Sequence, residues 1–177
     1  MLAIHLPAHG DSNGTQTCIP HSARQLSIII DAVGPLHAAI AHSVGSAILV
    51  EAMHGGLSVS QAVLIAAPAH YEDYARSVAT AVGLDAENTQ AMLDLLSTHM
   101  GVDIGEVSIP RRAQSLQQAA LFIHSADDRV VSIEDSLASA ANWPNARHMR
   151  VEGLGHRRIL SDASVITAAI EFIATSN

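Results

Sequence analysis

The chain has 177 residues, of which 49% are hydrophobic, and this length supports one hydrophobic core but argues against two full domains. Its net charge is −8 at pH 7, and Lys and Arg together number only 9, so the sequence lacks a basic surface for a nucleic-acid backbone. Aromatic residues make up 3% of the chain, which leaves few side chains for stacking on bases and predicts an aliphatic core.

The cysteine content and the N-terminus indicate the compartment. Cys18 is the single cysteine and cannot form an internal disulfide, as is usual in a reducing compartment. The first residues lack the basic stretch of a signal peptide, and no apolar run approaches membrane-spanning length. We therefore expect a soluble, cytoplasmic protein that associates with neither nucleic acid nor membranes. The sequence does not indicate its oligomeric state.

Short apolar runs alternate along the chain with segments of helical periodicity, which is typical of the α/β class, in which helices cover a mostly parallel sheet. Between the first two runs, apolar residues from Leu26 to Val33 recur at helical spacing, and Gly34 and Pro35 end this helix. The sequence predicts five strands, at residues 2–6, 36–41, 62–66, 119–124 and 147–152.

The stretch after the third predicted strand has helical periodicity without a strand pattern. Helices are predicted over residues 71–82 and 86–100, and Asp85 and Gly101 are suited to cap the two ends of the second helix. We interpret residues 69–118 as a helical insertion into a single α/β domain. The core of that domain consists of residues 1–68 and 119–177.

Two further helices are predicted in the C-terminal part of the chain. Ser132 opens the first of them, and Asp135 follows three residues later as in a variant of the capping box. The last helix carries an apolar face that we expect to pack on the sheet. That face consists of Val165, Ile166, Ala169, Ile170 and Ile173.

A metal site is not expected. His5 and His9 have the spacing of two ligands on one helical turn, but Pro7 lies between them and disfavours a helix. Nothing beside them completes a set of ligands.

A turn at residues 41–45 joins the second predicted strand to a helix and has the form small-x-Ser-x-Gly. Such a turn strains the backbone of Ser43 so that its hydroxyl is exposed, and Ala41 and Gly45 supply the small residues that the turn requires. The N–H of Val44, at the start of the helix, would then point at the oxygen of a carbonyl under attack. Because Ser and Gly are common, an ordinary strand–helix turn is the alternative.

An Asp-bearing loop and a His-bearing loop follow the last two predicted strands, so the chain order is Ser, Asp, His. Parallel strands bring their carboxyl ends to one edge of the sheet, where the three residues can meet. The hydroxyl of Ser43 needs an imidazole to accept its proton, and His156 is placed to do so. A carboxylate must hold the other nitrogen of that imidazole.

These segments give the chain a resemblance to bacterial members of the α/β-hydrolase superfamily. The matching segments read LPAHGDS, AHSVGS, HSADDRVV and GLGHRRIL. In that family the acid loop commonly reads His-Gly-x-x-Asp-x-x-Val, and aligning His124 with its first position selects Asp128 as the acid. Asp127 stays the alternative, since a shift of one residue is the commonest error in such an alignment.

The resemblance implies a serine hydrolase that acts on an ester or similar acyl bond through an acyl-enzyme. Ser43 would be the nucleophile, His156 the base, Asp128 the acid and Val44 a donor to the oxyanion. The substrate would be a small molecule, with no metal or organic cofactor. The helical insertion would form a lid, in which Val78, Val82, Leu93 and Leu96 shape a small apolar pocket.

The resemblance also implies a strand that this sequence lacks. In the family, a strand that precedes LPAHG ends in a His-Gly loop, which donates the second N–H to the oxyanion. That strand would lie between residues 2–6 and 36–41, so its loss predicts a gap in the sheet. The chain would then start upstream of Met1, pair its remaining strands directly, or be a truncated or decayed remnant that serves only as a binding protein.

His42, beside the serine, is interpreted as part of the packing of the turn and not as a second base. His124 is interpreted as a packed histidine of its loop. Arg157 and Arg158 are interpreted as solvated or paired side chains, with recognition of an acidic substrate as the alternative.

Overall fold

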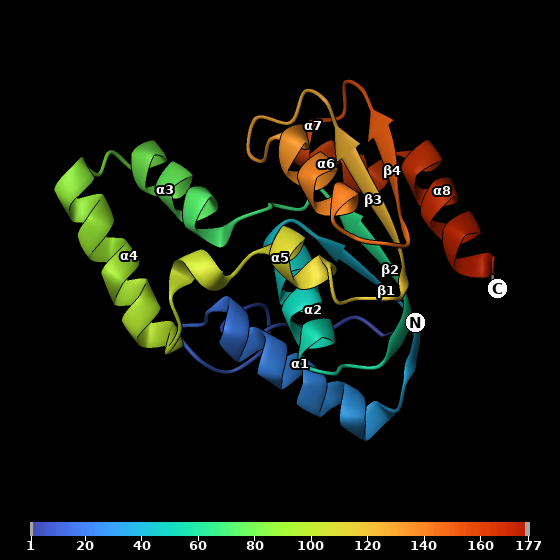
Figure 1. Ribbon diagram of the computed structural model, residues 1–177, viewed down its shortest axis with the longest axis horizontal. Helices are drawn as coiled ribbons and strands as arrows, with labels where there is room; N and C mark the ends of the chain where they lie inside the picture. Colours follow the sequence, from blue (N-terminus) through green and yellow to red (C-terminus); the bar gives the residue numbers. More distant parts are fainter. Residues whose placement is uncertain (1, 176–177) are drawn as a thin grey trace.

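The computed structural model describes residues 2–175 and contains a four-stranded parallel sheet with helices on both faces (Figure 1). The strands lie side by side in the order in which they occur along the chain. They are β1 (Leu36–His42), β2 (Val59–Ile65), β3 (Ala119–Ser125) and β4 (Ala146–Val151). The α/β class and four of the five predicted strands are therefore confirmed.

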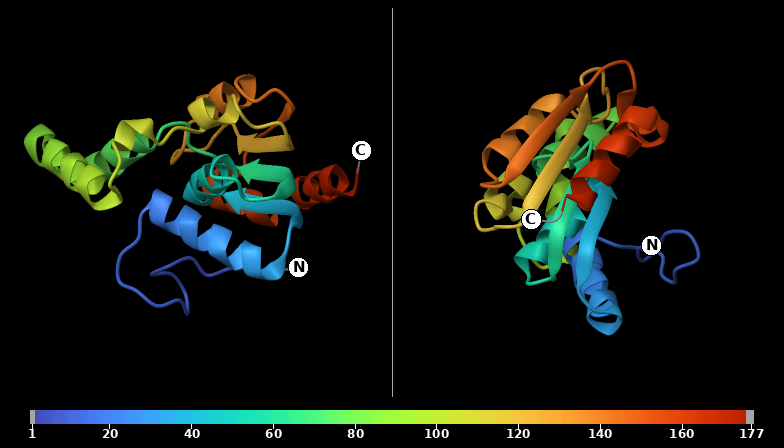
Figure 2. Two further views of the ribbon diagram at one scale, coloured as in Figure 1. Left: turned by 60° about the horizontal axis from the view of Figure 1, so that its bottom comes forward. Right: turned by 90° about the vertical axis from the view of Figure 1, so that its right-hand side faces the viewer.

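The sheet separates two layers of helices (Figure 2). Ala62 and Leu64 of β2 face the layer that contains α1 (Ile19–Val33), α2 (Val44–His54) and α6 (Ile133–Ala141). The alternate residues Val63 and Ile65 face α8 (Ala163–Ala174). Because β2 and β3 are covered on both faces, most of their residues are apolar.

The ends of the helices follow signals in the sequence. Pro20 lies in the first turn of α1, and Gly34 ends that helix with a φ of 103° while its N–H donates to the carbonyl of Ile30. The Asp85 carboxylate accepts from the N–H of Asn88 and begins α4 (Ala86–Met100). Within residues 2–175, no helix combines the length and the apolarity needed to cross a membrane.

A helical insertion separates β2 from β3 and extends beyond the sheet (Figure 1). The N–H of Ile109 donates to the carbonyl of Ala69, and the N–H of Tyr71 donates to that of Val107, so the two ends of the insertion are tied together. It contains α3 (Tyr71–Ala81), α4, the 3₁₀ helix η1 (Ile104–Glu106) and α5 (Ile109–Ala113).

The strand predicted over residues 2–6 is absent, and this prediction was wrong. Instead, Ile4 and Leu6 pack against the core on the α1 and α2 side, and the chain then turns around Pro7. A strand needs a neighbour for its N–H and C=O groups, and this segment pairs with none. It also does not pair directly with β1, which is an edge strand of the sheet.

Two predicted side-chain roles near the C-terminus were also wrong. Ile166 and Ile170 are 45% and 60% exposed, because α8 turns Val165, Ala169 and Phe172 toward the sheet. The helix is therefore rotated relative to the predicted face. Asp135 does not close a capping box: Ser132 accepts from the N–H of Glu134, whereas Asp135 accepts from the N–H of Ala69.

Phe122 is fully buried in β3, and its ring packs edge-on against the single tryptophan, Trp143, at 5.9 Å. We expect Phe122→Ala to lower the free energy of unfolding by about 3–5 kcal/mol, since it removes a large ring from the core. Urea denaturation followed by Trp143 fluorescence measures this change. Ile28→Ala, at a position that is 60% exposed in α1, is the control and should change stability by less than about 0.5 kcal/mol. Equal losses in the two variants would contradict this account of the core.

Candidate active site

Ser43 lies in a strained turn between β1 and α2. Its backbone has φ 54° and ψ −130°, a conformation that costs a residue other than glycine about 1–3 kcal/mol. Two hydrogen bonds hold it there: its N–H donates to the carbonyl of Ile65 and its carbonyl accepts from Ser46. The hydroxyl makes no capping bond to α2, so it is available for another partner.

His156 contacts the Ser43 hydroxyl although the two residues are 113 positions apart in the sequence. It belongs to the short helix α7 (Gly155–Arg158), which follows β4. Its Nε2 lies 3.0 Å from Ser43 Oγ, and its Nδ1 lies 2.8 Å from Asp128 Oδ2. Because a carboxylate can only accept, Nδ1 carries the proton and Nε2 is left to accept from the hydroxyl. The structure thus brings Ser43, Asp128 and His156 together at the carboxyl ends of β1, β3 and β4.

The Asp128 side chain is fully buried and fully hydrogen-bonded. Its Oδ1 accepts from the N–H groups of Val130 and Val131 at 2.8 and 3.1 Å, while Oδ2 accepts from His156. Burial by itself would raise the pKa of this carboxyl, but the bonds from Val130 and His156 outweigh it and lower the pKa below its usual value. Asp128 is therefore ionised at neutral pH.

Asp127 has a different set of partners. Its carboxylate accepts from the hydroxyl of Ser125 and from the N–H of Gly155, and the bond from Ser125 is the main cause of its lowered pKa. Ser125 Oγ also accepts from the N–H groups of Leu154 and Gly155, each at 3.1 Å. The structure therefore places Asp128 against His156, and Asp127 against the loop that carries His156.

Val44 is the first residue of α2, immediately after Ser43. Its N–H is one of the first-turn donors that have no acceptor inside a helix, and it lies at the positive end of the helix dipole. The expectation that Gly45 must be small is not supported, since a Cβ at this position would meet no atom within 4 Å. β1 is an edge strand of the sheet.

Two further histidines contact this group of residues. His42 Nε2 lies 2.8 Å from the carbonyl oxygen of His156, and the two rings are 4.7 Å apart. No local pattern predicts this contact, because the two residues are 114 positions apart. His124 is fully buried, with Nε2 3.1 Å from the carbonyl of Val131, and it packs beside Asp128. Burial is the main cause of the lowered pKa of both His42 and His124.

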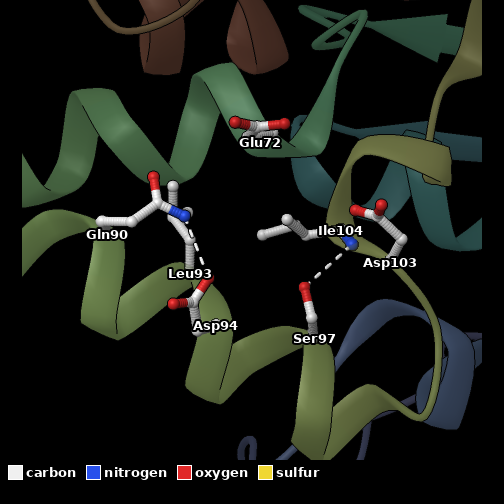
Figure 3. Close-up of a pocket in the computed structure, with 7 residues that line it drawn as sticks. All are labelled: Glu72, Gln90, Leu93, Asp94, Ser97, Asp103 and Ile104. Carbon is white, nitrogen blue, oxygen red and sulfur yellow. Dashed lines mark hydrogen bonds between the residues drawn. The ribbon is translucent and has the colours of Figure 1, made fainter.

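A cavity of about 430 Å³ lies within the helical insertion, between α3, α4 and η1 (Figure 3). Its lining is mostly polar: Glu72, Gln90, Leu93, Asp94, Ser97, Asp103 and Ile104. This cavity is not the apolar pocket predicted in the insertion. Of the residues predicted to shape that pocket, only Leu93 lines the cavity, and Val78 and Val82 are 42% and 69% exposed.

A second cavity, of about 850 Å³, lies at the amino ends of the strands, and Gln61, Asn145 and Phe172 are among its lining residues. None of Ser43, Asp128 and His156 lines either cavity.

His5 and His9 do not form a pair of ligands. His5 Nδ1 accepts from the N–H of Asp11, while His9 Nδ1 lies 2.9 Å from the carbonyl of Pro7. Over residues 2–175, no three or more His, Cys, Asp or Glu side chains are arranged to hold a metal ion.

No protein-family model and no curated protein matches the sequence. The fold does match solved structures. A protein of Mycobacterium tuberculosis H37Rv described as a non-heme bromoperoxidase, BpoC, is 17% identical with a TM-score of 0.71, and the match covers 96% of this chain and 79% of that chain. An esterase from Exiguobacterium antarcticum, EaEST, is 16% identical with a TM-score of 0.70, covering 96% and 80%.

A third structure, MGS-M2, is an α/β-hydrolase enzyme from a Medee basin deep-sea metagenome library. It is 12% identical with a TM-score of 0.71, and the match covers 98% of this chain and 78% of that chain. At these identities the likeness concerns the fold, and about a fifth of each neighbour has no counterpart here. Over nearly all of its length, the chain has the α/β-hydrolase fold.

Proposed function

We propose that the protein is a serine hydrolase that cleaves an ester or similar acyl bond of a small molecule through an acyl-enzyme. The arrangement of Ser43, His156 and Asp128 carries this proposal, with contacts of 3.0 and 2.8 Å between successive members. The similarity in fold to the Exiguobacterium antarcticum esterase supports the same class of reaction.

The first half of the reaction would transfer the acyl group to the enzyme. His156 Nε2 takes the proton from Ser43 Oγ as that oxygen bonds to the carbonyl carbon of the ester. The carbonyl oxygen becomes an oxyanion, which the N–H of Val44 stabilises. The intermediate then collapses, the carbon–oxygen bond to the alcohol breaks, and the proton on Nε2 passes to the leaving alcohol.

Water would complete the cycle. His156 takes a proton from water as the water oxygen bonds to the acyl carbon, and the bond to Ser43 Oγ then breaks and Oγ recovers the proton. Asp128 stays ionised and stabilises the positive imidazole at both stages. The product is a carboxylic acid, and the serine is regenerated.

The oxyanion in a hydrolase of this fold normally has two N–H donors. The turn provides the N–H of Val44, whereas the His-Gly loop that supplies the second donor in the family has no equivalent in the sequence. One such donor is typically worth about 2.7–4 kcal/mol, or about a hundred- to a thousandfold in rate, and we propose a contribution of this size for the N–H of Val44.

A second candidate is a non-catalytic binding protein built on the same fold. Two observations favour it: β1 pairs with a neighbour on one side only, and residues 2–6 lie outside the sheet. The two candidates differ in whether the Ser43 hydroxyl is activated, which a chemical probe of serine can measure.

The helical insertion is suited to act as a lid. It leaves the sheet directly after β2, at the same edge as the candidate site, since the N–H of Ser43 donates to the carbonyl of Ile65 at the end of β2. Asp135 of α6 accepts from the N–H of Ala69 and fixes the start of the insertion. A substrate that reaches Ser43 would therefore pass beside this segment.

Ser43→Ala should reduce hydrolysis of p-nitrophenyl acetate and butyrate at least about a hundredfold, because it removes the nucleophile. Treatment with a fluorophosphonate should add one adduct to Ser43 in the wild type and none in the variant, as read by mass spectrometry.

Ser46→Ala is the matched control. Ser46 is fully buried in α2, and its hydroxyl has no hydrogen-bond partner among residues 2–175, so its loss should leave the rate and the adduct unchanged. Equal hydrolysis by the wild type and Ser43→Ala, without an adduct, would favour the non-catalytic candidate.

The two adjacent carboxylates should respond differently to amide substitution. Asp128→Asn should lower kcat by about 10³- to 10⁴-fold, because an amide cannot stabilise the positive imidazole and favours the wrong tautomer of His156. Asp127→Asn should lower kcat less than about tenfold, since its amide oxygen can still accept from the N–H of Gly155. Steady-state kinetics with p-nitrophenyl butyrate tests the pair, and a larger loss in Asp127→Asn would reverse the assignment.

A further inference from the structure

The segment that carries His156 has apolar anchors only at its two ends: Leu154, just before α7, packs against the core, and Ile159, just after it, is fully buried. The helix α7 has no buried residue, and Gly153 and Gly155 lie at or just before its start with φ values of 75° and 58°. Glycines in this conformation leave the backbone free to adopt alternatives. Between these two anchors, hydrogen bonds fix the position of the imidazole relative to Ser43.

Most of these bonds act on the residues before His156. Ser125 accepts from the N–H groups of Leu154 and Gly155, and Asp127 also accepts from Gly155. These contacts fix the backbone just before His156 but do not involve the carbonyl group of His156 itself.

His42 supplies the contact to His156 itself. Its Nε2 lies 2.8 Å from the carbonyl oxygen of His156, and because a carbonyl can only accept, Nε2 of His42 carries the proton. Burial is the main cause of the lowered pKa of His42, which keeps the ring neutral at neutral pH. The ring also contacts that of His156, with a centroid distance of 4.7 Å and a tilt of 47°, so the two histidines are linked both through the backbone and ring to ring.

His42 immediately precedes Ser43 in the chain. The strand end that carries the nucleophile therefore also carries the donor that binds the backbone of the base. Any movement of α7 away from β1 would stretch this bond together with the contact between Ser43 Oγ and His156 Nε2.

We propose that His42 is a positioning residue, which holds the backbone of His156 so that the imidazole faces the Ser43 hydroxyl. This inference rests on the proposed hydrolase function. A displacement of about 1 Å between reacting groups can cost about a hundredfold in rate, so one such hydrogen bond has a measurable effect on kcat.

His42→Phe keeps an aromatic ring and removes the donor, and it should lower kcat for p-nitrophenyl butyrate by about ten- to a hundredfold with little change in KM. His42→Gln places an amide N–H near the position of Nε2 and should restore most of the lost kcat.

His148→Phe is the matched control. His148 Nε2 makes a 2.8 Å hydrogen bond to Ser136, away from Ser43, and burial lowers its pKa as it does for His42. This variant should keep the wild-type kcat. An unchanged kcat in His42→Phe, no recovery in His42→Gln, or an equal loss in His148→Phe would each overturn the proposal.

A readout that does not depend on turnover separates this proposal from the hydrolase function. In ¹H–¹⁵N spectra of the imidazoles, the wild type should show His42 protonated at Nε2, and His42→Phe should broaden or shift the His156 signals. Unchanged His156 signals would overturn the positioning role even if the wild type labels with fluorophosphonate. If the wild type neither labels nor hydrolyses esters, the hydrolase function fails, and these signals alone decide whether His42 holds His156.

Discussion

The parallel pairing of the four strands is the constraint on which the candidate site depends. His42 is in register with Ile65, Ile65 with Ile123, and Ser125 with Val151, so the four strands end at nearly the same level. The turn after β1 and the loops after β3 and β4 therefore open onto one edge. Side chains more than a hundred residues apart in the sequence therefore meet there.

Adjacent carboxylates on one short loop perform separate tasks in this arrangement. Asp128 turns inward, where backbone N–H groups and His156 surround it, whereas Asp127 turns toward the neighbouring loop and Gly155. His156 is thus held both by its ring, through Asp128, and by its backbone, through His42. The positions of the groups in the site thus depend on polar contacts between loops, while the aliphatic core positions the strands.

Sequence patterns predicted the elements whose signals are local. Asp85 and Gly34 marked helix ends correctly, and the order of the Ser, Asp and His loops placed three residues that the structure brings together. Features that depend on distant parts of the chain were not predictable. Residues 2–6 have strand-like composition but no neighbour, and the rotation of α8 depends on how the whole helix meets the sheet. The bond from His42 to His156 spans 114 positions and has no local pattern.

The backbone of Ser43 has a consequence for how this chain balances stability and chemistry. Its φ of 54° is one that glycine adopts without strain, so the serine is kept at a thermodynamic disadvantage in the middle of an otherwise regular strand–helix junction. A chain selected only for a stable scaffold would gain by replacing it. In the proposed hydrolase, the position of Ser43 is therefore where selection for folding and selection for activity act in opposite directions.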